Sequence, residues 1–304
     1  MTSQAIQTET KEESARRGFF LALAAYLLWG LLPFYIKWVG HLPIIEVVAH
    51  RIIWSVPIAA AVLVWLGRTA DFMNAIRSRR MLGMAALTAF LISLNWSIYL
   101  WAIVADRAVE GALGYYINPL VNVVVGALLL GEKLDRWQIV AVGLAAVAVS
   151  ILTYEQGTLP WISLGLALSF AAYGYFRKTL PIGPSQGFLL EVLLLSVPAV
   201  AYAIWLSISG QGHFFAGNAT DTWLLLGCGA VTAIPLLLFS FGARLLKFST
   251  IGIMQYIAPT MVFLIAVFAF KEPFGQAQAM AFGLIWAALA LYTWSMFANR
   301  NASQ

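Results

Sequence analysis

Charged residues are scarce in this sequence, and long polar stretches are nearly absent. Asp, Glu, Lys and Arg make up 10% of the 304 residues, whereas about 25% is usual for a soluble domain, and hydrophobic residues make up 62%. Little chain is left to form a soluble domain outside a bilayer. The composition therefore predicts an all-α polytopic membrane protein that acts within the lipid bilayer.

Cysteine and histidine are also rare, which limits the available chemistry. Cys228 is the lone cysteine and cannot form an intrachain disulfide. His41, His50 and His213 lie far apart with no cysteine cluster beside them, so we predict no metal site. The net charge of +5 comes from basic residues in short loops, a pattern that indicates membrane topology rather than a nucleic-acid partner.

Enzyme signatures are missing as well. The sequence has no Gly-x-x-x-x-Gly-Lys-Ser/Thr phosphate loop, which excludes ATP hydrolysis by that route. It also lacks the His-Glu-x-x-His, paired-aspartate and serine–histidine sets of intramembrane proteases. We therefore expect no cofactor and no enzymatic activity, and any transport must draw on a gradient or on exchange.

Ten apolar segments long enough to cross a bilayer follow a short polar tail. Residues 1–17 are polar and end in Arg16 and Arg17, so we expect a disordered cytoplasmic tail and no cleaved signal. The ten segments run over residues 18–38, 43–66, 81–104, 109–130, 137–153, 160–178, 185–208, 222–242, 250–270 and 275–297. Residues 298–304 form a second cytoplasmic tail.

The Lys and Arg residues fall mainly on one side of the predicted membrane. With the amino terminus inside, 14 of the 18 lie in inner segments and only Arg107 and Lys271 lie in outer loops. The 14 are Lys11, Arg16, Arg17, Arg68, Arg77, Arg79, Arg80, Lys133, Arg136, Arg177, Lys178, Arg244, Lys247 and Arg300. This bias predicts that both termini are cytoplasmic.

The sequence contains an internal duplication centred on residues 114–132. At a constant offset of 140, six residues recur: Tyr116, Ile117, Pro119, Glu132, Gln138 and Gly143 as Tyr256, Ile257, Pro259, Glu272, Gln278 and Gly283. Each copy is predicted as an apolar helix of roughly 20 residues with a proline in its first half. Because proline frees a backbone carbonyl, both copies should border something polar, and Pro119 and Pro259 are hinge candidates.

Five spans lie in each copy, over residues 18–153 and 160–297. Because five is odd, the second copy enters the membrane from the opposite side, and the two five-helix repeats are inverted. Ser55-Val56-Pro57 in the second span recurs as Ser196-Val197-Pro198 in the seventh. Inverted repeats are typical of secondary transporters, although channels and membrane enzymes can also be duplicated.

The second span carries the densest group of ionisable residues inside the predicted membrane. Glu46, His50 and Arg51 are spaced at i, i+4 and i+5, which places them on one helical face. Charges in a span are costly and normally face the bundle interior or water. A pair between Glu46 and Arg51, or with another helix, would offset that cost. Two interpretations stay open: a structural brace, and a gate or a contact to a charged substrate.

Amide and phenol side chains gather in the third, fourth and ninth spans. Asn95 with Tyr99, and Asn118 with Asn122, are i, i+4 pairs that each share a helical face. These faces either line a substrate cavity or tie helices together. The full set of cavity or gate candidates is Glu46, His50, Arg51, Asn95, Trp96, Tyr99, Tyr115, Tyr116, Asn118, Asn122, Gln255 and Tyr256.

Four short motifs stand in the second, third, fourth and ninth spans. They are His50-Arg51-Ile-Ile-Trp54-Ser55, Asn95-Trp96-Ser-Ile-Tyr99-Leu-Trp101-Ala102, Gly114-Tyr-Tyr-Ile-Asn-Pro-Leu-Val-Asn122 and Gln255-Tyr256-Ile-Ala-Pro259-Thr260. In this order they resemble the RarD-type branch of the EamA family, in the drug/metabolite transporter superfamily, over residues 18–297. The resemblance implies ten helices in two inverted repeats, a bacterial inner-membrane location and export of small metabolites or drugs through a central cavity.

We therefore predict a secondary active transporter that exports a small amphipathic metabolite or drug. Its coupling partner is a proton or an exchanged metabolite. The alternative is a small-molecule channel or a membrane receptor without coupled transport, which would give no saturable, coupled uptake in vesicles.

Overall fold

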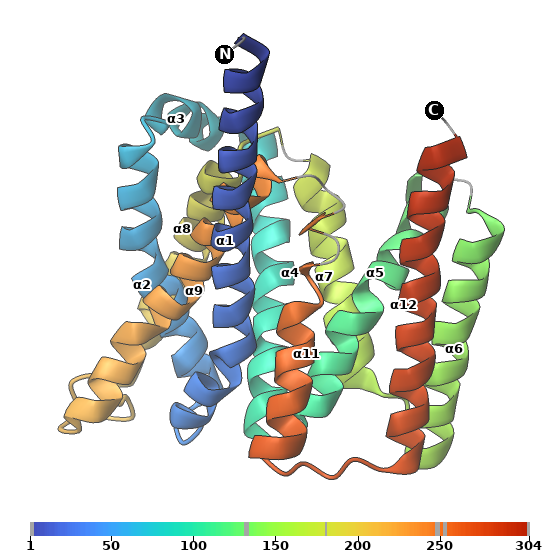
Figure 1. Ribbon diagram of the computed structural model, residues 1–304. Coiled ribbons are helices and arrows are strands. Elements are labelled where there is room, and N and C mark those ends of the chain that lie inside the picture. The colour runs from blue at the N-terminus through green and yellow to red at the C-terminus, as the bar shows by residue number, and fades with distance from the viewer. Residues whose placement is uncertain (1–2, 131–133, 180, 247–249, 252–253, 303–304) are drawn as a thin grey trace. The chain divides into compact units, whose positions relative to one another are not determined.

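The computed structural model describes residues 3–130, 134–179, 181–246, 250–251 and 254–302 (Figure 1). These residues form helices joined by loops, and the described ranges contain no strand, which confirms the all-α prediction. The duplicated residue Glu132 and the basic residues Lys133 and Lys247 lie outside the described residues.

Eight of the described helices contain a segment that is long and apolar enough to cross a membrane. The helices are α1 (Ser3–Trp38), α2 (Ile44–Trp65), α3 (Thr69–Arg77), α4 (Arg79–Val104), α5 (Ala108–Leu130), α6 (Arg136–Gln156), α7 (Trp161–Thr179), α8 (Pro184–Ile208), α9 (Ala219–Leu245), α11 (Ile257–Leu264), the π-helix η1 (Ile265–Ala269) and α12 (Gln276–Ala302). The eight spanning helices are α1, α2, α4, α5, α6, α8, α9 and α12. They coincide with eight of the ten predicted spans.

The two other predicted spans, 160–178 and 250–270, differ from the expectation. The first forms α7, but Arg177 and Lys178 near its end leave it less apolar than the eight. In the second, a turn at Gln255 and Tyr256 precedes α11, whose 8 residues continue into the 5 of η1. At about 1.5 Å per residue, this helix is shorter than the roughly 30 Å core of a bilayer. The ten-helix count is therefore not confirmed.

The duplicated prolines occupy different local structures. Pro119 lies in the interior of α5, whereas Pro259 lies in the first turn of α11. Proline is tolerated in a first turn, because its missing N–H would have no helical partner there. The expectation that each proline stands inside a helix of roughly 20 residues is therefore met by Pro119 and not by Pro259.

Two local features differ from the sequence-based expectation. Residues 3–17, expected to be disordered, are the first part of α1. Residues 298–302, predicted as a tail of unspecified structure, continue α12. Once a helix is nucleated, each added residue contributes a hydrogen bond, so polar flanks can extend an apolar helix. The short helix α3, in a segment expected to be a loop, buries Phe72 and Ala75.

The described chain divides into two compact units, each drawing on both halves of the sequence. Unit 1 comprises residues 1–93 and 176–261, and unit 2 comprises residues 94–175 and 262–304. Residues of α4, α7 and α11 therefore belong to both units. The repeat boundaries at 18–153 and 160–297 describe the duplication and stay a prediction.

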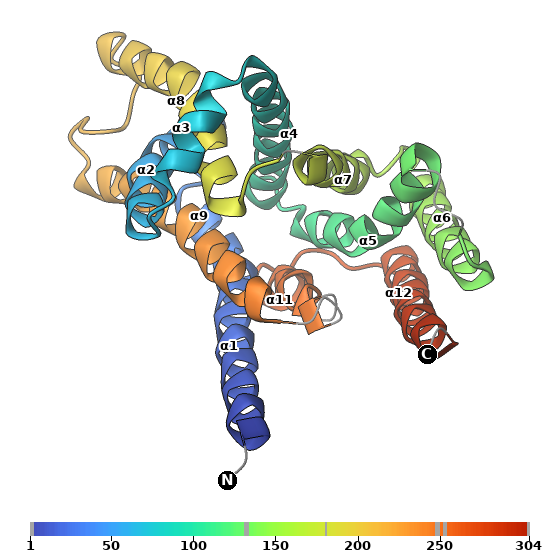
Figure 2. The same cartoon turned by 90° about the horizontal axis from the view of Figure 1, so that it is seen from above.

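Unit 1 is built around α2, which packs along α8 on one side and α9 on the other (Figures 1 and 2). Close approach depends on glycine: a Cβ at Gly229 of α9 would collide with the backbone of Trp54 in α2. α9 also packs along α1, where a Cβ at Gly242 would lie 2.7 Å from the backbone nitrogen of Ala22. Small residues at such crossings are typical of membrane helices.

Unit 2 pairs α12 with α6 and packs α5 against both. Aromatic side chains of this unit pack together: the rings of Phe263 and Phe282 are 4.6 Å apart, and Tyr116 packs edge-on to Phe282 and Trp286. Where α5 approaches α7, a Cβ at Gly114 would lie 2.8 Å from the carbonyl oxygen of Ser163. The glycine of the duplicated segment thus sits at a helix contact.

Candidate functional site

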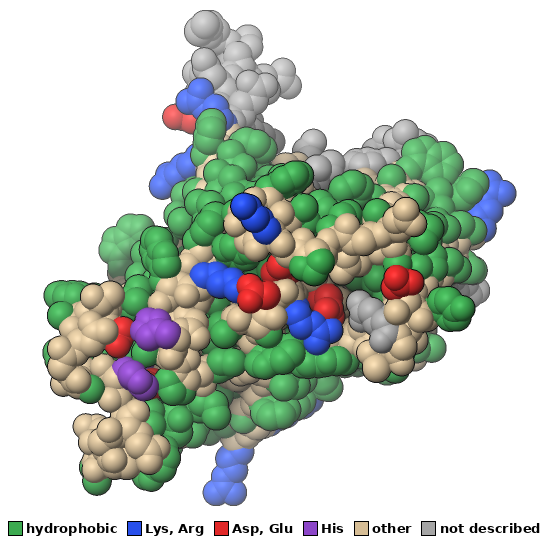
Figure 3. All heavy atoms as spheres, turned by 90° about the horizontal axis from the view of Figure 1, so that it is seen from below, with side chains coloured by type: hydrophobic (Ala, Val, Ile, Leu, Met, Phe, Trp, Pro, Cys, Tyr) green, Lys and Arg blue, Asp and Glu red, His purple; other side chains and the backbone are tan. Residues whose placement is uncertain are grey.

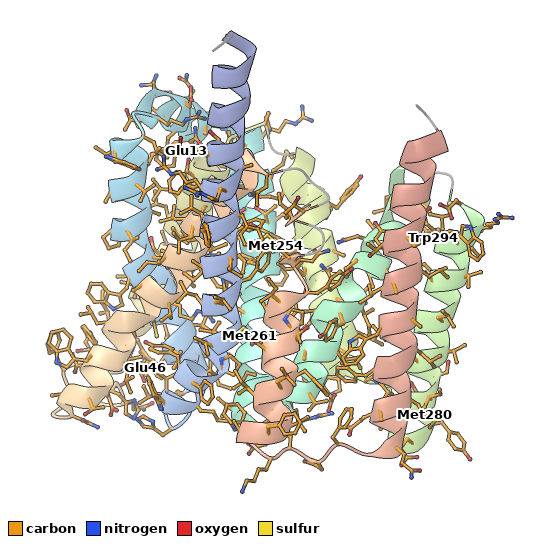
Figure 4. All side chains as sticks on the ribbon, in the orientation of Figure 1. Glu13, Glu46, Met254, Met261, Met280 and Trp294 are labelled. Atoms are coloured by element: carbon orange, nitrogen blue, oxygen red, sulfur yellow. The ribbon has the colours of Figure 1, made fainter. Side chains whose placement is uncertain are left out.

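Glu46 lies in the first turn of α2 and is 1% exposed (Figure 4). Its carboxylate accepts two hydrogen bonds from His213, from the backbone nitrogen at 2.8 Å and from Nδ1 at 2.7 Å. His213 belongs to the loop between α8 and α9. A carboxylate is also favoured at this position by the partial positive charge of a helix N-terminus. The buried acid of α2 is therefore held from outside its own helix.

Arg51 follows on the same helix and is 5% exposed. Its Nε donates a 3.0 Å hydrogen bond to the hydroxyl of Thr232 on α9, and that hydroxyl donates to the carbonyl of Cys228 at 2.8 Å. The cation is thus held at the contact between α2 and α9.

His50, 3% exposed, lies between aromatic groups. The indole N–H of Trp54 donates to its Nδ1 at 3.0 Å, so this nitrogen serves as an acceptor. The ring of Phe214, from the loop between α8 and α9, lies 4.7 Å from the His50 ring and 5.7 Å from the Trp54 ring. Aromatic pairs of this kind add to the stability of the site beyond area burial.

The predicted charged face of α2 is therefore buried as a set, but its members turn to different partners. Glu46 binds the loop before α9, Arg51 binds α9 itself, and His50 lies against Phe214. The pairings considered for Glu46 were with Arg51 or with another helix, but its observed partner, His213, lies in the loop between α8 and α9. That partner is 167 residues away in sequence, which no helical spacing could reveal.

Two further polar groups of unit 1 were not among the predicted site residues. Tyr35 of α1 donates its hydroxyl to the carbonyl of Leu224 and lies 3.5 Å from the sulfur of Cys228. Glu191 of α8, 2% exposed, accepts a 2.8 Å hydrogen bond from Thr88 and lies 3.4 Å from Nε of Arg177. An acid in an apolar span is the signal that points to Glu191.

In unit 2, Asn95 links three helices. Its amide nitrogen donates to the carbonyl of Leu166 and to the hydroxyl of Ser169, both at 3.0 Å, and its amide oxygen accepts from Tyr115 at 3.1 Å. Leu166 and Ser169 belong to α7 and Tyr115 to α5. Asn95 is 1% exposed, so this network lies inside the unit.

Among the remaining candidates of unit 2, some side chains pack inside the unit and others are exposed. The Tyr99 ring lies 5.4 Å from the Tyr115 ring, and Trp96 is half-buried. Asn118 is 7% exposed, and its amide oxygen has no hydrogen-bond partner among the described residues. Asn122, one turn further along α5, is exposed. The two asparagines thus differ in environment despite their i, i+4 spacing.

Gln255 and Tyr256 are half-buried at the turn before α11 and belong to unit 1. The structure therefore does not join them to Asn95 or Tyr115 within one compact unit.

Glu272 has a role that the duplication did not predict. Its two carboxylate oxygens accept hydrogen bonds from the backbone nitrogens of Ala108 at 2.8 Å and Val109 at 2.9 Å. These are the first residues of α5, whose N–H groups have no partner within the helix. A duplicated glutamate thus caps the helix that carries Pro119.

The fold and these sites define a class: a mostly apolar, all-helical polytopic membrane protein with ionisable and amide groups buried between its spans. Comparison with known proteins then gives the family. Residues 16–154 match the model of the EamA-like transporter family. The chain belongs to the RarD-type branch of this family.

Full-length relatives support this assignment. Protein RarD of Streptomyces exfoliatus is 40% identical over 96% of this chain and 93% of its own length. An uncharacterized transporter of Bacillus subtilis, YojE, is 40% identical over 95% of this chain and 97% of its own length. One solved crystal structure shares the fold at a TM-score of 0.58 and 18% identity, covering 90% of this chain and 96% of that chain. The protein is therefore a multi-pass bacterial membrane transporter rather than a member of an enzyme family.

Replacing Asn95 by alanine should destabilise unit 2. Interhelical hydrogen bonds in membranes contribute about 0.6 kcal/mol each on average, so losing the three of Asn95 should lower the free energy of unfolding by about 2 kcal/mol. Unfolding in detergent measures this difference. Asn122→Ala, at an exposed position, is the control and should change stability by less than about 0.5 kcal/mol. Equal stability of the two variants would refute the structural role of Asn95.

Proposed function

We propose that the protein is a secondary active transporter that exports a small amphipathic metabolite or drug by alternating access. One observation carries this proposal: Glu46, His50 and Arg51 are all buried in an apolar helix pair. Charged residues inside spans are costly, by about 2.5–3.5 kcal/mol at the centre on insertion scales and by less near the ends, and such residues mark substrate or ion pathways. Packing alone would not require three ionisable groups within six residues.

The partners of Glu46 and Arg51 also support a movement of α2 relative to α9 and the loop before it. Arg51 is held by a neutral hydroxyl of Thr232, and Glu46 by a histidine in a loop. When its partner withdraws, each polar group can take water or a charged substrate as a replacement, and without a replacement the buried group would be costly. Arg51 is our candidate for contact with a charged group of the cargo or with a mobile gate.

Asn118 supports a polar cavity in the other unit. Its buried amide oxygen lacks a hydrogen-bond partner among the described residues, and buried acceptors are normally satisfied by water or another polar group. It precedes Pro119 directly. We propose that Pro119 and Pro259 act as hinges and that Asn118, Tyr115 and Tyr116 border a polar cavity within unit 2. We also propose that the cargo combines an apolar body with polar groups.

The inverted arrangement of the two halves gives the proposal its mechanism. If residues 18–153 and 160–297 form inverted five-helix repeats, exchange of conformation between them converts an outward-open state into an inward-open one. The excess of Lys and Arg in the predicted inner loops supports cytoplasmic termini at the inner membrane. A proton or an exchanged metabolite is the proposed coupling partner.

Inverted membrane vesicles containing the protein should take up cargo in a saturable and concentrative manner. The assay uses radiolabelled amino acids, nucleosides and amphipathic antibiotics, with an imposed pH gradient, without one, and after preloading with unlabelled compound. Stimulation by the gradient identifies proton coupling, and stimulation by preloading identifies exchange. Non-saturable flux that only equilibrates would instead establish a channel, and binding without flux would establish a receptor. Vesicles lacking the protein are the control.

The inverted repeat predicts the side on which each loop lies. Topology reporters fused after Arg80, Lys178 and Asn299 should report the cytoplasm, and a reporter inserted at Gly212 should report the outside. Five spans per half require this pattern, because the second half must enter from the opposite side. A cytoplasmic reporter signal at Gly212 would rule out the inverted arrangement.

A further inference from the structure

Two histidine–carboxylate pairs in unit 1 join the same two regions of the chain. His213 binds Glu46, with Nδ1 2.7 Å from the carboxylate, and His41 binds Asp221, with Nε2 2.8 Å from the carboxylate. His41 lies in the loop before α2 and His213 in the loop before α9. Glu46 and Asp221 lie in the first turns of α2 and α9.

The two pairs are therefore reciprocal. The acid that begins α2 is bound from the loop before α9, and the acid that begins α9 is bound from the loop before α2. We refer to the four residues Glu46, His213, Asp221 and His41 as the clasp. Because α2 and α9 pack along each other, the clasp links the loops and first turns at one end of this helix pair.

Burial within the clasp is uneven. The side chains of Glu46 and Asp221 are 1% and 8% exposed, whereas those of His213 and His41 are 37% and 53% exposed. Histidine side chains lie beside acidic ones on the face seen from below (Figure 3). The histidines can thus leave the carboxylates toward solvent, while the carboxylates stay fixed in their helices.

The loop that carries His213 also covers the interior of the helix pair. Phe214, its next residue, packs its ring against His50 and Trp54. Gly210 and Gly217 flank these residues with φ of +68° and +97°, a backbone region that glycine adopts without strain. His213 and Phe214 can therefore move together when the loop swings away.

We propose that the clasp is a latch that holds this end of α2 and α9 closed and that opens as a unit during transport. This inference rests on the proposed alternating-access function, because a latch is needed only if the end opens. Opening breaks both histidine–carboxylate pairs and withdraws Phe214 from His50. Water then reaches the two carboxylates and the polar groups of Arg51 and Thr232 beneath them.

Cys228 provides a native reporter of opening. It is the one cysteine of the sequence, it is 0% exposed, and it lies two helical turns beyond Asp221 on α9. The experiment measures the rate at which N-ethylmaleimide labels the full-length protein in membrane vesicles. Labelling needs no knowledge of the cargo, and the extent of labelling after denaturation in SDS gives the amount of protein.

Weakening the clasp should accelerate the labelling of Cys228. Pairs of partly exposed ionisable groups contribute modestly, so Glu46→Gln or Asp221→Asn alone should raise the rate by about threefold and the two together by about tenfold. The exchanged pair Glu46→His with His213→Glu should return the rate toward that of the native protein. This exchange distinguishes loss of the latch from a general loosening of the fold.

Asp71→Asn is the matched control. Asp71 lies on α3, beyond the other end of α2, where its carboxylate is 3.5 Å from the amide nitrogen of Gln186. Cys228 of the Asp71→Asn variant should be labelled at the same rate as Cys228 of the native protein. An unchanged rate in Glu46→Gln/Asp221→Asn, or an equal rise in Asp71→Asn, would overturn the latch.

Measuring vesicle uptake alongside labelling shows whether the latch proposal or the transport proposal has failed. A protein that transports but shows no effect of the clasp on labelling lacks the latch alone. A protein whose clasp controls labelling but that shows no coupled uptake keeps an opening element and is not a secondary transporter.

Discussion

Polar groups inside a bilayer must find partners within the protein, because lipid offers none, and this constraint organises unit 1. The ionisable residues of α2 meet it through α9 and the loop before α9: Glu46 through His213, and Arg51 through Thr232. α9 must therefore lie close against α2, and Gly229 permits that approach at the backbone of Trp54. The packing of α9 against α2 and the pairing of the α2 charges thus depend on each other. A transporter can use this dependence, since moving one helix exposes the charges of the other.

The sequence predicted the membrane class, eight of the spans and the burial of the α2 charges, because these depend on local composition and helical spacing. The partners could not be predicted, because His213 is 167 residues from Glu46 and Thr232 is 181 residues from Arg51, and no spacing rule connects them. The ninth span shows a second limit. It contains no charged residue, yet the short helix α11 begins only after a turn at Gln255 and Tyr256, and Pro259 occupies the first turn of that helix. Hydropathy does not record where a helix begins.

The duplicated residues were informative about position and uninformative about role. Glu272 was recognised only as a repeat marker, although it caps the first N–H groups of α5. Asn118 and Asn122 looked equivalent from their spacing, but Asn118 is buried and Asn122 is exposed. An i, i+4 pair defines a face of a helix, and neighbouring helices decide how much of that face they cover. Asn95 was predicted as a cavity or gate candidate; in the structure its three hydrogen-bond partners make it a junction between α4, α5 and α7.

The central claim is that the buried charge of Arg51 serves transport and does more than hold α2 against α9. The direct measurement is the rate of coupled vesicle uptake, per inserted molecule, for a variant with both partners replaced by apolar residues, Arg51→Leu with Thr232→Val. Removing both members of a buried polar pair can leave stability nearly unchanged. We predict normal abundance in the membrane and loss of uptake. Normal abundance with normal uptake would contradict it and leave Arg51 as a structural brace.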